Sequence, residues 1–345
     1  TKVMYRLVQG DVGCGKTFVA AMSAYASVLS HYQVAILAPT EILAKQHLKS
    51  FAFLKEYGVR IEVLYSAESA KEKKEILEKL KNHEIDILIG THSLLEKNVS
   101  FARLGLVIID EQQRFGVEQR RALKEKGNTV DFLLMSATPI PRTLASTLYG
   151  DTDVSTIETM PSGRKEVITK LIEENSFRSV LPEIEELLAK GHQLYVICAS
   201  IQESETFDIK NVEEVGETLK KLFAGRYKVG LLHGQLDSLS KQEVMQAFYD
   251  NQIQVLVSTT VVEVGMNVVN ATGMIIYDAD RFGLSQLHQL RGRIQRGSSQ
   301  GNCYLLTGSK DPKVLERLNV LVKTSNGFEI SYEDLRLRGP GDILG

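Results

Sequence analysis

The stretch Gly10-Asp11-Val12-Gly13-Cys14-Gly15-Lys16-Thr17 decides the fold of this chain. Two glycines bracket four positions before Lys and Thr, which is the pattern of a phosphate-binding loop between a strand and a helix. Gly13 and Gly15 allow the positive φ angles that let backbone N–H groups surround an anion. A helix expected from Gly15 onward directs its positive end at the phosphates. The residues expected to bind a nucleotide are Gly10, Gly13, Cys14, Gly15, Lys16 and Thr17.

Within this loop, Lys16 is expected to contact the β and γ phosphates, and Thr17 is expected to bind Mg²⁺. The alternative is a glycine-rich turn followed by an accidental Lys-Thr pair. The complete pattern, with a helical segment behind it, favours the nucleotide site.

The composition indicates a globular protein of about two domains. The chain has 345 residues, 43% hydrophobic and 24% charged. No apolar run approaches the roughly 18 residues that span a bilayer. The formal net charge is −2, so any contact with a polyanion must be local. Cys14, Cys198 and Cys303 match neither a disulfide framework nor a zinc cluster, which favours a reducing cytoplasm. The chain starts without Met, and we expect a fragment of a longer protein.

Short apolar runs recur along the chain, with longer polar or helical segments between them. Runs of Val, Ile and Leu without alternation are typical of strands buried on both faces of a parallel sheet. The sequence therefore predicts two α/β lobes, each with a mostly parallel sheet flanked by helices. The predicted strands are 34–37, 85–89, 104–109, 132–135, 194–198, 229–232, 253–257, 274–277 and 303–306, and the predicted helices are 70–82, 177–189 and 212–223.

The boundary between the lobes is expected within 152–165, where Pro and Gly interrupt the chain and periodicity fades. We place the first lobe at 1–158 and the second at 159–310. Two such lobes would leave a cleft for a ligand between them.

Two adjacent carboxylates, Asp110 and Glu111, follow the buried run 104–109. Asp110 is suited to hold Mg²⁺, and Glu111 to orient and deprotonate the water that attacks the γ phosphate. The alternative is a polar strand end that caps a helix. Ser136 and Thr138, at another strand end, either bond to Gln113 or only satisfy turn N–H groups.

Arg293 and Arg296 are three residues apart, so they would share one face if residues 289–296 are helical. Their guanidinium groups could stabilise the charge that develops on the γ phosphate during transfer. A solvated basic helix is the alternative, although the embedded Gly292 suggests a close approach.

These motifs resemble the motor of superfamily 2 helicases, and within them the RecG family of bacterial branched-DNA helicases. The likeness covers nearly the whole chain, and the transcription-repair coupling factor Mfd is the nearest rival. Two positions depart from the RecG pattern, which has His in place of Gln113 and Gly in place of Gln295. The segments that carry the resemblance are 10–17, 39–43, 90–92, 110–116, 136–142, 258–265, 281–293 and 337–341.

The resemblance implies two tandem RecA-like lobes, of the P-loop NTPase fold, that use ATP and Mg²⁺ to move on double-stranded DNA. It implies action on replication forks and Holliday junctions, with Gln113 taking part in coupling and residues 311–345 starting a translocation motif. It also implies a monomer in the bacterial cytoplasm, associated with the nucleoid, with a single-stranded-DNA-binding protein as a further partner. The implied DNA contacts are Thr40, Thr91, His92, His233, Thr259, Thr260 and Arg338.

Two other functions remain open from the sequence. One is an Mfd-like translocase that acts against RNA polymerase. The other is a clamp that binds ATP and DNA without hydrolysis, which Gln113 and Gln295 make conceivable. Each implied DNA contact, taken singly, is more often a capping or core residue.

Overall fold

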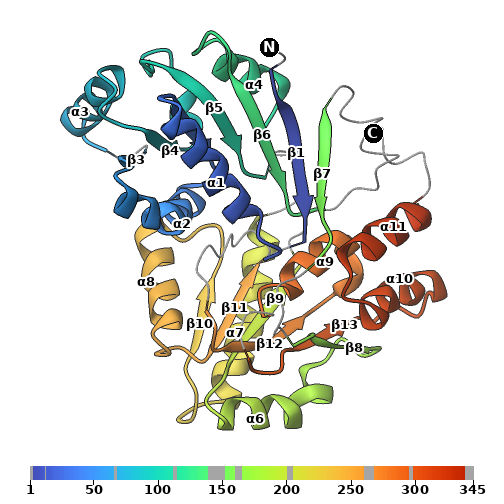
Figure 1. Ribbon diagram of the computed structural model, residues 1–345. Helices are drawn as coiled ribbons and strands as arrows, with labels where there is room; N and C mark the ends of the chain where they lie inside the picture. The colour runs from blue at the N-terminus through green and yellow to red at the C-terminus, as the bar shows by residue number, and fades with distance from the viewer. Residues whose placement is uncertain are drawn as a thin grey trace. The chain divides into compact units, whose positions relative to one another are not determined.

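The computed structural model describes residues 3–11, 13–65, 68–111, 115–138, 152–159, 165–199, 205–259, 268–294 and 298–338, with the backbone alone at 117, 205–210 and 338. The chain divides into two compact units, Thr1–Pro161 and Ser162–Gly345. Each unit is a parallel sheet with helices on both faces, which confirms the predicted α/β class (Figure 1). Within the described ranges, we find no helix with the length and apolar composition that a membrane crossing requires.

The first sheet has the strand order β3-β4-β2-β5-β6-β1-β7, and all of its pairs are parallel. Its strands are β1 (Tyr5–Gly10), β2 (Gln33–Leu37), β3 (Ile61–Leu64), β4 (Ile87–Gly90), β5 (Leu104–Ile109), β6 (Asp131–Ser136) and β7 (Asp153–Ile157). The helices are α1 (Lys16–Leu29), α2 (Glu41–Phe51), α3 (Ala70–Lys81) and α4 (Val117–Lys124), with short 3₁₀ helices η1 (Ala52–Tyr57) and η2 (His92–Leu95).

Alternate residues of the central strand β2 face opposite sides of this sheet. Val34 and Ile36 pack in one core with α1 and α2, whereas Ala35 and Leu37 pack in a second core with α3 and α4. Figure 1 shows α1 lying across the sheet, where it contacts β1, β2 and β5. Because both faces are covered, the strands read as continuous apolar runs.

The second sheet has the order β10-β11-β9-β12-β13-β8, again with every pair parallel. Its strands are β8 (Ile168–Ile172), β9 (Gln193–Cys198), β10 (Val229–Leu232), β11 (Val255–Thr259), β12 (Ala271–Ile276) and β13 (Asn302–Leu306). The helices are α6 (Leu181–Ala189), α7 (Glu205–Leu222), α8 (Ser238–Tyr249), α9 (Leu284–Arg291), α10 (Pro312–Lys323) and α11 (Gly327–Arg338), with η4 (Phe177–Val180) and η5 (Ala279–Arg281). Numbered along the chain, β8 to β13 take the same order as β1 to β6.

The apolar runs predicted as strands are confirmed, but β1 and the edge strands β3, β7 and β8 were not among them. β7 falls inside the segment 152–165 that was predicted to lack regular structure, and it pairs with β1 at the edge of the first sheet. Its residues are only half-buried or exposed, and three of the five are Asp, Ser and Thr. An edge strand buries less apolar surface, so its sequence lacks the apolar run on which the prediction relied.

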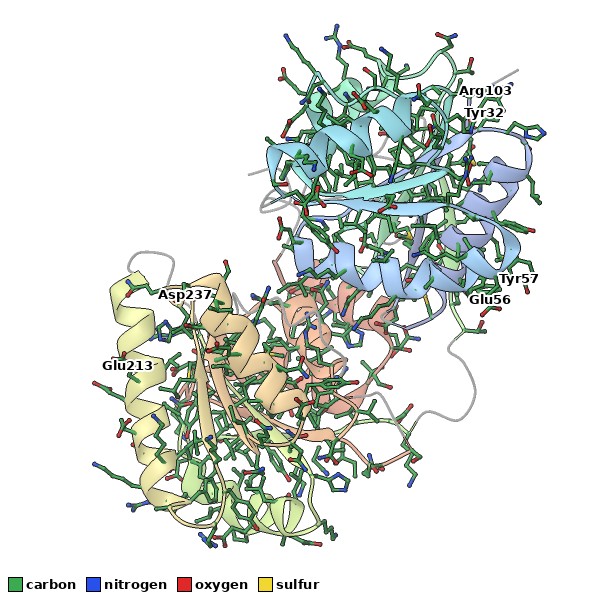
Figure 2. The ribbon with its side chains drawn as sticks, turned by 90° about the vertical axis from the view of Figure 1, so that its left-hand side faces the viewer. Tyr32, Glu56, Tyr57, Arg103, Glu213 and Asp237 are labelled. Atoms are coloured by element: carbon green, nitrogen blue, oxygen red, sulfur yellow. The ribbon has the colours of Figure 1, made fainter. Side chains whose placement is uncertain are left out.

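A buried glutamine begins the second strand of each unit. Gln33, 0% exposed, donates through Nε2 to Leu80 O (2.9 Å) and Ile85 O (2.8 Å). Its Oε1 accepts the N–H of Arg103 (2.9 Å), whose guanidinium lies 4.2 Å from the ring centroid of Tyr32 (Figure 2). The side chain therefore connects three chain segments at the amino end of the sheet.

Gln193 holds the equivalent place in the second unit and is also 0% exposed. Its Nε2 donates to Phe248 O (2.6 Å) and Ile253 O (2.7 Å), and its Oε1 accepts from Asn270 Nδ2 (3.1 Å). The two units thus share a buried polar contact as well as a strand order.

We expect Gln33→Leu and Gln193→Leu each to lower the free energy of unfolding by about 1–3 kcal/mol, because buried carbonyl groups lose their donors. Urea unfolding followed by circular dichroism measures the change. Gln242→Leu, on an exposed position of α8, is the matched control and should leave the midpoint nearly unchanged. A midpoint for Gln33→Leu equal to that of the parent would contradict this account.

Candidate functional site

The phosphate loop joins the carboxyl end of β1 to α1. Gly13 and Gly15 have φ angles of 77° and 105°, in the left-handed region that favours glycine. α1 begins at Lys16, and a Cβ atom placed on Gly15 would meet no atom within 4 Å. The amino end of α1 therefore adjoins open space, as an anion site at a helix N-terminus requires.

Lys16 folds back over this loop. Its Nζ donates to the backbone oxygens of Gly10 (2.5 Å) and Asp11 (2.9 Å), and it lies 3.8 Å from Cys14 Sγ. Cys14 is 8% exposed, and a Cβ atom on Gly10 would lie only 2.5 Å from its Sγ. The small residues at 10 and 14 thus let the loop close tightly, with the Lys16 ammonium group at its centre. Thr17 is half-buried in the first turn of α1.

Asp110 follows β5, and both of its carboxylate oxygens are engaged. Oδ1 accepts the N–H of Glu111 (2.9 Å), and Oδ2 lies 2.7 Å from Nε2 of His47 on α2. Burial by itself would raise the pKa of Asp110, but the hydrogen bond and attraction of His47, the Glu111 N–H and the charge of Lys16 together lower it. Asp110 is therefore an ionised carboxylate at neutral pH.

Glu111 adopts a φ angle of 49°, which places its backbone in the left-handed region. Such a conformation is uncommon for a residue with a long side chain and concentrates at functional sites. Asp278, which follows β12 in the second unit as Glu111 follows β5, has a φ angle of 48°. The chain therefore turns sharply after the equivalent strand of each unit.

Ser136 forms a turn at the end of β6. Its Oγ accepts the N–H of Thr138 (3.2 Å) and donates to Thr138 O (3.3 Å), as the turn alternative requires. Gln113 lies outside the described residues, as do Thr260 and Arg296, and so does the side chain of Arg338.

The candidate DNA contacts of the first unit lie at the ends of the neighbouring strands β2 and β4. Thr40 caps α2, because its Oγ1 accepts the N–H of Leu43 (3.3 Å). Thr91 is buried directly after β4, and the exposed His92 next to it lies 5.4 Å from the Phe115 ring, centroid to centroid. The structure brings these three residues to one stretch of the sheet edge.

In the second unit, His233 and Thr259 lie at the ends of the paired strands β10 and β11. Thr259 is 3% exposed, and its Oγ1, like Oγ of the preceding Ser258, has no hydrogen-bond partner among the described residues. Nδ1 of His233 is likewise buried without a partner in the described part of the chain. A buried polar group without a partner costs about 1–3 kcal/mol, so three together at one edge indicate a functional site.

α9 ends at Arg291, with Gly292 as its C-cap, and Arg293 lies half-buried in the turn beyond it. The condition under which Arg293 and Arg296 would share a helical face is therefore not met at residue 293. Gly292 explains the difference, because glycine is a weak helix former and readily ends a helix.

Arg291, which the sequence analysis did not select, is buried to 4% exposure. Its Nη1 donates to Thr169 Oγ1 (3.1 Å) and Leu321 O (2.5 Å), and its Nη2 contacts His288 Nδ1 (2.9 Å) and donates to Thr324 O (3.1 Å). It thus joins α9 to β8 and to the carboxyl end of α10. A signal existed in the sequence: 284, 287, 288 and 291 follow the helical spacing of a buried face.

Two family models match the chain. The DEAD/DEAH box helicase domain matches residues 3–147, and the helicase conserved C-terminal domain matches residues 176–298. The ATP-dependent DNA helicase RecG of Bacillus subtilis is 52% identical over 343 residues, and that of Streptococcus pneumoniae is 50% identical over 342 residues. The chain is RecG-like along almost its whole length.

A solved structure of RecG bound to a three-way DNA junction superposes on this RecG-like chain with a TM-score of 0.83 and 41% identity, covering 99% of this chain and 45% of that one. The resemblance expected from the sequence is therefore confirmed, as is the pair of RecA-like lobes. The chain spans 50% and 51% of the lengths of the two curated RecG relatives.

We expect Arg291→Leu to destabilise this RecG-like chain by about 3 kcal/mol, because buried carbonyl and hydroxyl groups lose a charged donor. Arg178→Leu, at an exposed arginine of the same unit, is the control and should have little effect. Urea unfolding followed by circular dichroism compares the two, and equal midpoints would show that the buried contacts of Arg291 add nothing.

Proposed function

We propose that this chain is an ATP-dependent DNA helicase motor, which binds MgATP and uses its hydrolysis to translocate on double-stranded DNA and to remodel forks and Holliday junctions. The observation that carries the proposal is the phosphate loop, in which Gly13 and Gly15 adopt left-handed φ angles and Lys16 Nζ folds back onto backbone oxygens. Asp110 follows β5 of the same parallel sheet. The RecG relatives, named as ATP-dependent DNA helicases, support the proposal.

The residues of the loop fit MgATP. Gly10, Gly13, Cys14 and Gly15 form a backbone cradle for phosphates, and Lys16 would exchange its carbonyl partners for phosphate oxygens. No cluster of three or more His, Cys, Asp or Glu side chains suited to a metal occurs among the described residues. Mg²⁺ beside a nucleotide needs few protein ligands, because phosphates and water supply the rest, so Thr17 and Asp110 suffice.

The other proposed catalytic residues would act on groups whose charge changes during phosphoryl transfer. Glu111 would orient and deprotonate the attacking water, and Gln113 would relay the state of the nucleotide. Arg293 and Arg296 of the second unit would stabilise the developing charge.

The DNA contacts of the proposal are Thr40, Thr91, His92, His233, Thr259, Thr260 and Arg338. The buried hydroxyl of Thr259, which has no partner within the part of the chain that the structure describes, supports its assignment, because a phosphate oxygen would supply an acceptor. The solved RecG bound to a three-way junction supports branched DNA as the ligand.

The proposed domains are residues 1–158, 159–310 and 311–345, the last starting a translocation motif. Arg317 on α10 donates through its guanidinium to Asp280 O and Phe282 O, both at 2.6 Å. The third segment therefore packs with residues 162–310 in one compact unit. We further propose a monomer associated with the bacterial nucleoid, with a single-stranded-DNA-binding protein as a partner.

Steady phosphate release that requires Mg²⁺ and rises with DNA is the expected result for the parent chain. Lys16→Ala should abolish it and leave the fold intact, because the half-buried Lys16 lies outside the core. Turnover is measured with forked, linear and no DNA. Nucleotide binding without any turnover would point to the clamp, and near-normal turnover by Lys16→Ala would refute the nucleotide site.

Arg293→Ala should reduce kcat by about 10³–10⁵ and leave nucleotide affinity nearly unchanged, because its contribution arises only in the transition state. Lys16→Ala, in contrast, affects both quantities. Equilibrium binding of a nucleotide analogue and single-turnover rates separate the two effects. Brisk hydrolysis by Arg293→Ala would exclude this residue from the active site.

A further inference from the structure

His47 is a buried histidine beside the candidate nucleotide site. It lies on α2, is 6% exposed, and packs its ring edge-on against Phe51 with the centroids 6.1 Å apart. Ala44 and Phe51 of the same helix are buried in the core that α2 shares with the sheet. The helix therefore holds the imidazole in a fixed place, with Nε2 2.7 Å from Asp110 Oδ2.

The direction of this hydrogen bond follows from the state of Asp110. An aspartate is a carboxylate at neutral pH, and a carboxylate accepts hydrogen bonds and donates none. Nε2 of His47 must therefore carry the proton and donate it to Oδ2.

Two donors fix the orientation of the carboxylate. His47 donates to Oδ2, and the N–H of Glu111 donates to Oδ1. A carboxylate has about four lone-pair positions, so each oxygen keeps a free position for Mg²⁺ or for water bound to it. The Asp110 N–H also donates to Leu37 O (3.0 Å), which anchors the backbone at the end of β2.

We propose that His47 is a positioning residue, which orients the Asp110 carboxylate toward the Mg²⁺ of the bound nucleotide. The inference rests on the proposed function. Carboxylates that bind metals are themselves held by hydrogen bonds, and losing such a partner typically costs about 10–100-fold in metal affinity or activity. If His47 only filled space beside Phe51, an apolar residue of similar volume would serve equally well.

Three variants separate these roles. His47→Leu keeps much of the volume and removes the donor, whereas His47→Gln can place an amide N–H near the position of Nε2. Phe51→Leu loosens the same packing and retains the hydrogen bond. The readout is the Mg²⁺ concentration that half-saturates binding of a fluorescent ADP derivative to the whole chain, without DNA.

We expect His47→Leu to raise this concentration about 10–100-fold, His47→Gln to restore most of the loss, and Phe51→Leu to leave it near the parent value. If His47→Leu does not fold, His47→Asn replaces it, because the shorter side chain withdraws its donor from Oδ2.

An unchanged Mg²⁺ requirement in a folded His47→Leu or His47→Asn protein would overturn the inference and leave the proposed function standing. An equal shift in Phe51→Leu would also overturn it, because packing would then explain the effect. If binding of the ADP derivative to the parent chain does not depend on the Mg²⁺ concentration, that result would instead overturn the proposed function, and the inference with it.

Discussion

Each sheet runs all of its strands in one direction, so the carboxyl ends of all strands meet at a single edge. In the first unit this edge divides into two halves. The phosphate loop and Asp110 follow β1 and β5, whereas Thr40 and the pair Thr91 and His92 follow β2 and β4. Because β2 lies between β4 and β5, candidate nucleotide and DNA residues occupy adjoining parts of one rigid edge. α2 crosses from one half to the other, since it begins after Thr40 and carries His47 to Asp110.

The second unit repeats this plan without the nucleotide loop. The strand orders match, a buried glutamine begins β2 and β9, and the left-handed residues Glu111 and Asp278 follow β5 and β12. The difference lies after the first strand of each unit. β1 leads into a glycine loop, whereas β8 leads to η4, which Ser176 caps through the Arg178 N–H (3.3 Å). The repeated features stabilise the fold, and the single loop gives the first unit its chemistry.

The sequence predicts what depends on local composition. Central strands are visible because both of their faces are buried, and the phosphate loop is visible because glycine, Lys and Thr are required at fixed spacings. Edge strands such as β7 lack that burial, so they resemble a linker. The contacts of His47 and Arg291 could not be predicted from spacing, because only the fold brings their partners near. Asp110 lies 63 residues from His47 along the chain, and Leu321, whose carbonyl Arg291 contacts, lies 30 residues from Arg291. The sequence shows only that His47 and Arg291 are each a polar residue at a position whose helical spacing matches the buried apolar face of its helix.

Charge separates the two halves of the first unit's edge. The nucleotide half contains both an ammonium group, on Lys16, and an ionised carboxylate, on Asp110, which suits a highly charged ligand with Mg²⁺. The half with the candidate DNA contacts offers hydroxyl groups and an imidazole, side chains of the kind that bond to phosphate oxygens without adding fixed charge. The formal net charge of −2 is consistent with this division, because a chain without a basic surplus can contact a polyanion only locally.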